Sequence, residues 1–279
     1  MKKHLTALAI LVLLTPLVSK AVIGGKLDLS DGAGVLQILM TEDRACTATK
    51  IGKSLLITAA HCFDDSASLV GFSVKSINKD FDFTSLTIEK VIIHPSYKAL
   101  TNTDYEESIK VLDIAIVRVK ESAEFDLLPA RQFDFSQITP ETRLSFYGYG
   151  CDKSVNDLEN YFPQRKVSET VSLKIETLKS KHGIMTPLYR ELSALMYRNS
   201  IITPGQRYDS EQASVCYGDS GGPIFKGDKI VGINTLYTFN DINNSGESTS
   251  GISYLNLHAR VSTAKEWIEQ TLNEIESSY

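Results

Sequence analysis

The sequence predicts an all-β fold, a sandwich or a barrel, because most of its apolar segments are short, strand-like and bounded by turn residues. Branched and aromatic side chains dominate these segments, and Gly, Asp, Asn or Pro separates them. The clearest are GVLQILM (34–40), SLLITAA (54–60), LTIEKVIIH (86–94), LDIAIVRV (112–119), RLSFYGYG (143–150) and KIVGINTLYTF (229–239). Helical periodicity is confined to a few places, so we expect strands to form most of the structure.

Two segments do have helical spacing. Residues 186–198 place three leucines on one face, and the C-terminal segment 262–276 does the same with Ile268, Leu272 and Ile275. Thr263 and Glu266 have the spacing of a capping box at the start of the second helix. We expect both helices to pack against the sheets.

The composition is that of an ordinary globular protein, with 42% hydrophobic and 23% charged residues in a chain of 279. The formal net charge is −5, and no run of basic residues is longer than two. These values give no reason to expect a nucleic-acid partner.

Residues 1–21 have the pattern of a secretory signal peptide. Lys2 and Lys3 precede a run of about ten apolar residues, and Ser19 and Ala21 supply the small residues of a cleavage site. The alternative is a buried core helix. The run is too short to span a bilayer, and no later apolar stretch approaches the length needed, so we expect no membrane span after its removal. The predicted location is extracellular, or periplasmic if the source is bacterial.

An exported protein uses its cysteines differently from a cytosolic one. The four cysteines form no C-x-x-C pair, which disfavours a structural zinc site and favours two disulfides. Four cysteines allow three pairings, and their spacing alone does not choose among them.

Three short motifs carry candidate chemistry. Ser220 lies in the glycine-rich GDSGGP (218–223), which taken alone could be a surface turn. A serine nucleophile needs a neighbouring base, and His61 in TAAHC (58–62) is one. Asp113 stands within the apolar LDIAIV (112–117), where a carboxylate is costly unless it is hydrogen-bonded.

These three motifs, in this order, resemble the chymotrypsin/trypsin family of serine proteases, as do VIGG (22–25), VIIHPSY (91–97) and VSTAKEWI (261–268). The resemblance runs from Val22 to about Ile268. It implies two packed antiparallel six-stranded β-barrels with a C-terminal helix. The N-terminal barrel would span about 22–122, a linker about 123–136, the C-terminal barrel about 137–261 and the helix 262–276.

The resemblance also implies the catalytic roles. Ser220 would be the nucleophile, His61 the general base and then acid, and Asp113 the group that orients His61. The N–H groups of Gly218 and Ser220 would form the oxyanion hole, and Thr235 would hydrogen-bond Asp113.

The disulfides are assigned in the same way. Cys46–Cys62 matches the family bridge that anchors the histidine loop. Cys216 lacks its usual partner, and the resemblance makes Cys151–Cys216 a non-standard second bridge.

The primary pocket departs from the family's tryptic members. Its floor would hold Ser214 in place of an aspartate, with Tyr237 at a wall and Asn256 at a second position. A cationic side chain would enter without a counter-charge, so we expect apolar, aromatic or small side chains to be preferred, in a pocket with a polar floor. Asp241 is the alternative, because it could swing into the pocket and restore basic specificity.

The start of the domain suggests a switch. In the family the new amino terminus pairs with the aspartate before the nucleophile, here Val22 with Asp219. Because the signal cut would leave Val22 first, we expect export and activation to be one event.

We expect protein or peptide substrates, a monomeric state and no cofactor, and a protein inhibitor is a further candidate partner. Asp80 and Asp82 alone are a poor calcium site, and no other metal site is predicted. The alternative function is a catalytically silent binding protein that keeps the protease fold, for which labelling of Ser220 is the discriminating test.

Overall fold

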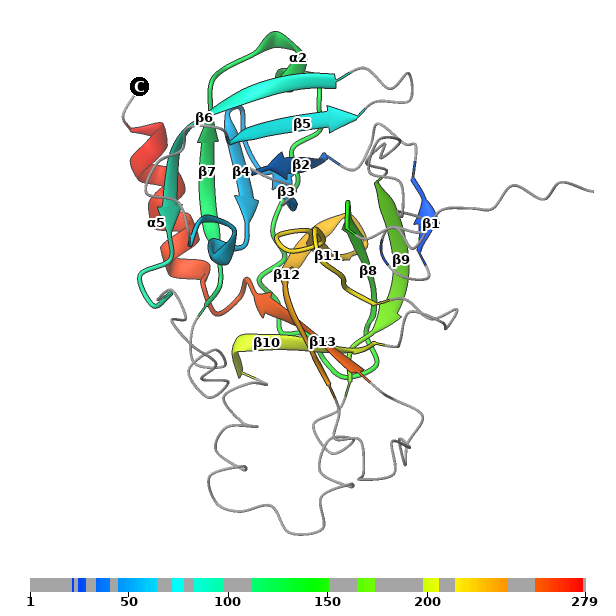
Figure 1. Cartoon of the computed structure of the whole chain (residues 1–279). Coiled ribbons are helices and arrows are strands. Elements are labelled where there is room, and N and C mark those ends of the chain that lie inside the picture. The colour runs from blue at the N-terminus through cyan, green and yellow to red at the C-terminus, as the bar shows by residue number, and fades with distance from the viewer. Residues whose placement is uncertain are drawn as a thin grey trace, which may run out of the picture.

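Two antiparallel β-sheets build the molecule in the computed structural model, with a C-terminal helix against the first (Figure 1). The structure describes residues 22, 25–28, 34–40, 45–64, 72–77, 83–97, 112–150, 165–173, 198–205, 214–239 and 254–277. The predicted signal peptide, the predicted helix 186–198 except Arg198, Cys151, Asp241 and the pair Asp80 and Asp82 lie outside these residues.

The first sheet is a closed six-stranded barrel in the order β2-β3-β4-β7-β6-β5. Its strands are β2 (Val35–Leu39), β3 (Ala45–Lys50), β4 (Leu55–Thr58), β5 (Ser73–Ile77), β6 (Phe83–Ile93) and β7 (Ala115–Val119). Closure leaves no unpaired edge, and the interior is filled by apolar side chains such as Leu36, Ile57 and Val117.

The second sheet has seven strands in the order β1-β9-β8-β11-β12-β13-β10. They are β1 (Lys26–Leu27), β8 (Arg143–Gly148), β9 (Lys166–Val171), β10 (Ser200–Gly205), β11 (Pro223–Lys226), β12 (Lys229–Phe239) and β13 (Tyr254–Arg260). The prediction of six strands here was one short, because the two residues of β1 pair with the edge strand β9. All-β architecture with two barrel-like sheets is confirmed.

The segment between the sheets contains a short helix, α2 (Ala123–Asp126), tied to the first barrel by a buried lysine. Lys50 Nζ donates to the carbonyl oxygens of Phe125 (2.6 Å), Asp126 (3.3 Å) and Leu128 (2.7 Å). Burial lowers the pKa of Lys50, and the charge of Asp126 opposes that shift. The three carbonyls supply the polar contacts that a buried ammonium needs.

The C-terminal helix α5 (Lys265–Glu276) returns to the first barrel (Figure 1). Ile268 is fully buried in the same core cluster as the barrel residues, and the Trp267 ring lies edge-on to His94 at 4.9 Å. The predicted capping box does not form: the N-cap is Ala264, and Thr263 Oγ1 donates to Arg198 O at 3.0 Å.

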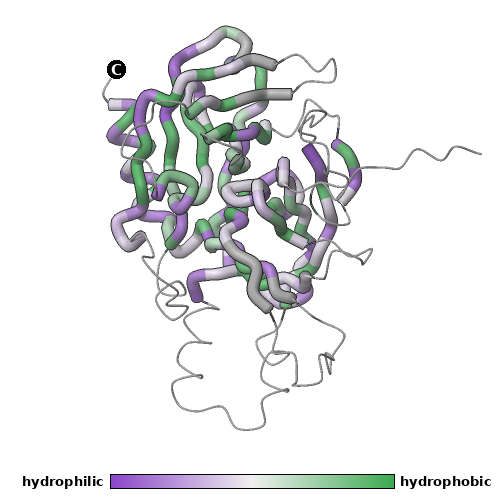
Figure 2. The backbone as a smooth tube through the Cα atoms, viewed as in Figure 1, coloured by the Kyte–Doolittle hydropathy of each residue, from purple (hydrophilic) through white to green (hydrophobic). Residues whose placement is uncertain are grey.

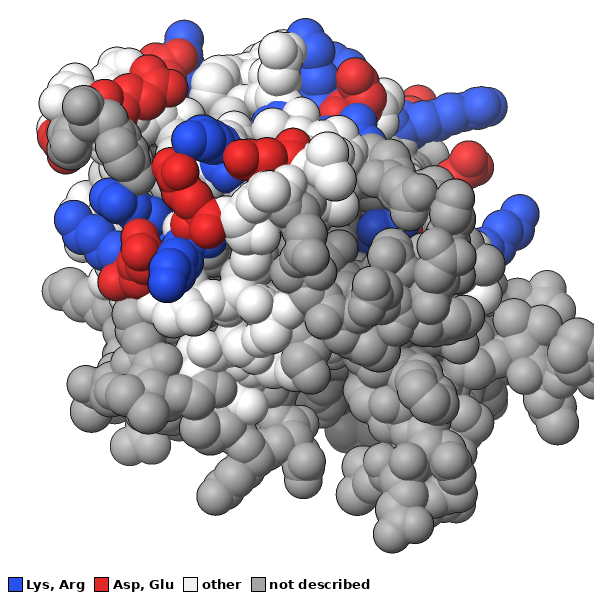
Figure 3. Space-filling view, turned by 90° about the horizontal axis from the view of Figure 1, so that it is seen from above, with Lys and Arg blue, Asp and Glu red and all other residues white. Residues whose placement is uncertain are grey.

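Hydropathy follows this architecture, with green apolar segments concentrated along the strands (Figure 2). On the face shown in Figure 3, basic and acidic side chains alternate over the described surface. Elsewhere in the described residues, Lys53 pairs with Glu121 (3.0 Å) and Arg118 with Glu89 (3.1 Å). In the described residues no helix is long and apolar enough to cross a bilayer.

Candidate active site

His61 and Asp113 form the best-defined pair of the site. His61 lies in the 3₁₀ turn Ala60–Phe63 after β4, and Asp113 lies just before β7, the strand paired with β4. Asp113 Oδ2 lies 2.6 Å from His61 Nδ1, and Asp113 Oδ1 accepts from the His61 backbone N–H at 2.9 Å. Since an ionised carboxylate only accepts, His61 carries its proton on Nδ1 and leaves Nε2 free to act as a base.

The environment of His61 favours its protonated form. Burial of the ring lowers its pKa, but the charge and hydrogen bond of Asp113, together with the charge of Asp64, outweigh burial. The net pKa is above the usual 6.5. An imidazolium formed during a proton transfer is therefore stabilised where it forms.

A disulfide holds the histidine turn to the neighbouring strand. Cys46 of β3 and Cys62 form the predicted bridge, with Cα atoms 6.4 Å apart. Cys216 is also disulfide-bonded, and its predicted partner Cys151 lies outside the described residues. Cys46, His61 and Cys62 are close enough together to suggest a metal site, but both sulfurs are consumed by the disulfide.

The loop that carries Ser220 packs directly on the first barrel. The Thr47 N–H donates to Ser220 O at 2.7 Å, and Thr47 Oγ1 donates to Gly218 O at 2.7 Å. A Cβ placed on Gly221 would lie 2.0 Å from Thr58 Oγ1 and 2.9 Å from the Ala59 nitrogen. The half-buried Ser220 is thus held against the chain that leads into His61.

Within this loop, most N–H groups have acceptors in the protein. The nitrogens of Asp219, Gly221 and Gly222 donate to Cys216 O, Asn234 O and Asp219 O. Among the described residues no acceptor is found for the N–H groups of Gly218 and Ser220. These two are the groups that the resemblance assigns to the oxyanion hole.

Asp219 is fully buried beneath the nucleophile. Gly150 N donates to its Oδ1 (2.8 Å) and Cys216 N to its Oδ2 (2.9 Å). Burial raises its pKa to about 7, although both hydrogen bonds and the charge of Lys166 lower it. Lys166 pairs with Gly148 across β8 and β9, and a Cβ on Gly148 would meet Asp219 Oδ1, so carboxylate and lysine share one face of the sheet.

The predicted partner of Asp219 is not bonded to it here. Val22 is fully buried in the core of the second sheet, beside Ile138 and Phe146. Among the described residues no hydrogen bond or ion pair joins Val22 to Asp219. In this chain residues 1–21 precede Val22, so its nitrogen is an amide rather than an ammonium.

The predicted pocket residues are partly brought together. Ser214 Oγ donates to Asn256 Oδ1 at 3.0 Å, and both residues are buried. Tyr237 pairs with Asn256 across β12 and β13, but its side chain lies outside the described part of the structure. Thr235 differs from its assigned role: its hydroxyl donates to Leu257 O at 3.0 Å rather than to Asp113. A bulge at this point of β12 turns Thr235 toward β13.

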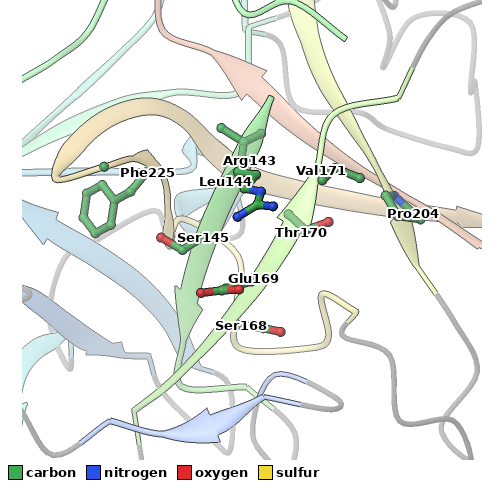
Figure 4. A pocket seen from close by; sticks show the side chains of 10 residues that line it. Arg143, Leu144, Ser145, Ser168, Glu169, Thr170, Val171, Pro204 and Phe225 are labelled. Atoms are coloured by element: carbon green, nitrogen blue, oxygen red, sulfur yellow. The ribbon is translucent and has the colours of Figure 1, made fainter. Parts of the chain in front are cut away.

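A separate cavity of about 640 Å³ lies on β8 and β9 (Figure 4). Arg143, Glu169 and Phe225 are among its lining residues, and none of the predicted site residues contributes to it. Its place on the sheet face separates it from the His61 turn.

Sequence reasoning missed Thr47, Asn234 and His258. Thr47 is one of several alternating residues in ACTATK, and Asn234 lies unmarked within KIVGINTLYTF. A lone histidine such as His258 is usually a core residue, so nothing local distinguished these three. Only the pairing of the strands reveals them.

Comparisons with known proteins identify the family of the chain. The family model described as Trypsin matches residues 29–268. The chain is 26% identical to chymase of Mus musculus over 232 residues, covering 79% of this chain and 83% of the chymase. It is 25% identical to trypsin of Simulium vittatum, covering 67% of this chain and 68% of that trypsin.

Solved structures show the same fold. A scabies mite inactivated protease paralogue superposes with a TM-score of 0.62 at 17% identity, over 90% of this chain and 97% of its own. Neuropsin, a serine protease of mouse brain, superposes with a TM-score of 0.62 at 17% identity, over 89% and 98%. On the family match and the shared fold, the chain belongs to the trypsin-like serine protease family.

Proposed function

We propose that the protein is a secreted serine endopeptidase that cleaves peptide bonds through Ser220, His61 and Asp113. The observation that carries the proposal is the double hydrogen bond from His61 to Asp113, which fixes the tautomer that a general base needs. The packing of the Ser220 loop against Thr58 and Ala59, which precede His61 in the chain, supports the pairing of this nucleophile with that base.

The reaction follows from these positions. Ser220 Oγ attacks the substrate carbonyl carbon while His61 Nε2 takes the hydroxyl proton. The N–H groups of Gly218 and Ser220 donate to the developing oxyanion, each typically worth ~3–4 kcal/mol. His61 then gives the proton to the leaving amine, which departs and leaves an acyl-enzyme. Water then attacks the acyl-enzyme with the same help from His61, and the carboxylic acid product leaves while Ser220 regains its proton.

We further propose that removal of residues 1–21 activates the enzyme. Val22 has φ 43°, which is unfavourable for a β-branched residue, and a cut before it removes the carbonyl group of residue 21 that makes this angle costly. The freed ammonium would then compensate the buried Asp219 carboxylate. Breaking one partner of such a buried pair typically costs ~3–5 kcal/mol.

The primary specificity is proposed to lie outside Lys and Arg. Ser214 and Asn256 hydrogen-bond each other and neither is charged, so the floor offers no counter-charge to a cation. Peptides that differ only in the residue before the scissile bond test this directly. Turnover confined to Lys or Arg would contradict it.

A fluorophosphonate probe tests the function itself. We expect it to label Ser220 in the chain that begins at Val22, and Ser220→Ala to abolish both labelling and turnover. Amino-terminal sequencing of the labelled protein identifies the first residue. An unlabelled but folded protein would favour the alternative of a catalytically silent binding protein. The scabies mite inactivated protease paralogue shows that this fold occurs without activity.

A further inference from the structure

Five buried polar side chains form a continuous hydrogen-bonded chain through the second sheet. Each is at most 3% exposed. We name them the His258 network, and in order they are Asn234, His258, Thr203, Asn256 and Ser214.

Strand register places the network on one face of the sheet. His258 pairs with Asn234 across β13 and β12, and Asn256 pairs with Thr203 across β13 and β10. His258 and Asn256 are two apart on β13, so their side chains point the same way. The network therefore crosses three adjacent strands.

The donor and the acceptor can be assigned for both hydrogen bonds of the His258 ring. Asn234 Nδ2 donates to Tyr147 O (3.1 Å) and Asp219 O (3.2 Å), so its Oδ1 faces His258 Nδ1 at 2.9 Å as an acceptor. His258 must then carry its proton on Nδ1, and its Nε2 accepts from Thr203 Oγ1 at 2.9 Å. Burial lowers the pKa of His258 to about 3, which keeps the ring neutral.

The donors and acceptors around Asn256 and Ser214, at the other end of the network, follow from these assignments. With its proton given to His258, Thr203 Oγ1 accepts from Asn256 Nδ2 (3.3 Å), which also donates to Pro204 O (3.0 Å). Asn256 Oδ1 therefore faces Ser214 Oγ (3.0 Å) and the Val215 N–H (3.1 Å). All the hydrogen-bonding capacity of the Asn256 amide is used inside the protein.

The network begins at the nucleophile loop. Asn234 O accepts from Gly221 N (2.7 Å), and its N–H donates to Gly222 O (2.8 Å). Its side chain also holds the carbonyl oxygen of Asp219, next to Ser220. One hydrogen-bonded path thus joins the nucleophile loop to the predicted pocket floor.

We propose that His258 is a positioning residue that orients the pocket floor and thereby sets the class of side chain accepted before the scissile bond; this inference rests on the proposed function. Because the Ser214 proton is given to Asn256, Ser214 offers only lone pairs to a substrate. The floor then favours an uncharged side chain that donates a hydrogen bond, such as the amide of Gln, over an apolar side chain of the same length.

Matched substitutions at Thr203 test the inference. Thr203→Val keeps the shape but removes the hydroxyl that links His258 to Asn256, whereas Thr203→Ser keeps the hydroxyl. The readout is the ratio of kcat/KM for two peptides with Gln or Met before the scissile bond. We expect Thr203→Val to lower the Gln:Met ratio about five- to tenfold, as for loss of one oriented hydrogen bond. Thr203→Ser should keep the ratio.

An equal ratio in wild type and Thr203→Val would overturn the inference while leaving the protease function intact. Absence of turnover by the wild type would instead contradict the proposed function. A uniform fall in kcat/KM for both peptides would also overturn the inference, because it would mean a purely structural role.

A second measurement reads the network without catalysis. In ¹⁵N-histidine-labelled Ser220→Ala protein, His258 should give the signals of a neutral ring protonated on Nδ1 at neutral pH. Assignment comes from their loss in His258→Phe. In Thr203→Val the Nε2 signal should shift, since its hydrogen-bond donor is gone. A ring protonated on Nε2, or doubly protonated at neutral pH, would overturn the inference.

Discussion

The backbone N–H of Thr47, in strand β3 of the first barrel, donates to the carbonyl oxygen of Ser220, in the loop before β11, at a distance of 2.7 Å. The Thr47 side chain extends the contact, since its Oγ1 donates to Gly218 O (2.7 Å) and accepts from Tyr149 N (3.1 Å). A single buried threonine therefore ties three points of the second sheet and its loops to strand β3.

Replacing Thr47 with Val should destabilise the protein by about 1–3 kcal/mol, because Gly218 O and Tyr149 N lose a buried partner. We expect kcat/KM to fall about tenfold with it, as the proposed oxyanion loop loses its support. Denaturant unfolding and peptide turnover measure the two effects.

Thr49 provides the matched control, two residues along the same strand. Its hydroxyl is buried and has no hydrogen-bond partner among the described residues. Thr49→Val should therefore be neutral or slightly stabilising. Equal losses from the two variants would show that the Thr47 hydroxyl has no special role.

The pH dependence of kcat/KM should report His61. Activity should rise with pH as the imidazolium loses its proton, with a midpoint above the usual 6.5 because the pKa of His61 is raised. Asp113→Asn removes the charge that offsets burial, so the midpoint should move to lower pH and kcat should fall about 10⁴-fold. The charge of Asp64 raises the pKa of His61 less than Asp113 does, so Asp64→Asn should move the midpoint only slightly. A midpoint that does not move in Asp113→Asn would contradict the assignment.

Asp219 should make the stability of the full-length chain depend on pH. Its folded pKa is about 7 against 3.8 for the free group, so the folded state binds the proton more tightly. Stability should fall as pH rises from about 4 to about 7, by up to about 4 kcal/mol. In the chain that begins at Val22, the ammonium should abolish most of this fall.

Unfolding of both chains in a Ser220→Ala background, at several pH values below 7, tests that expectation. Asp219→Asn is the control, because it should flatten the profile of the full-length chain. Identical slopes for the two chains would refute pairing of Val22 with Asp219.

Gly221 and Gly227 should respond very differently to alanine. Both have positive φ, 83° and 65°, so each substitution strains the backbone. A Cβ at Gly221 would also collide with Thr58 Oγ1 and Thr47 O, whereas nothing lies within 4 Å of one at Gly227. We expect Gly221→Ala to abolish turnover and Gly227→Ala to cost only about 1–2 kcal/mol of stability. Similar unfolding midpoints for both would contradict the close packing of the two sheets.

Much of the fold could be predicted from sequence because the strands are marked by apolar runs between turn residues. The closed barrel depends on such runs, and LDIAIVRV and SLLITAA became the paired strands β7 and β4. The two-residue β1 could not be predicted, since its two exposed residues carry no pattern and its pairing is set by the edge of β9.

The motif residues were predictable for a similar reason, but their supports were not. His61 and Asp113 stand out because a histidine and an acid interrupt apolar segments. Thr235 was assigned by position alone, and the bulge in β12 gives its hydroxyl a different acceptor. Contacts between residues far apart in the chain, such as Asn234 with His258, depend on strand register, which a single sequence does not specify.

The contact between Thr47 and Ser220 also has a consequence for biosynthesis. His61 and Asp113 adjoin strands β4 and β7 of the barrel, whereas Ser220 lies in the loop before β11 of the second sheet, so neither half alone holds all three proposed catalytic residues. Activity should emerge only when the two halves dock, at the end of folding, and refolding experiments should show it lagging behind the formation of β-structure. If the proposed function holds, a partly folded chain should therefore be inactive, whatever the state of its amino terminus.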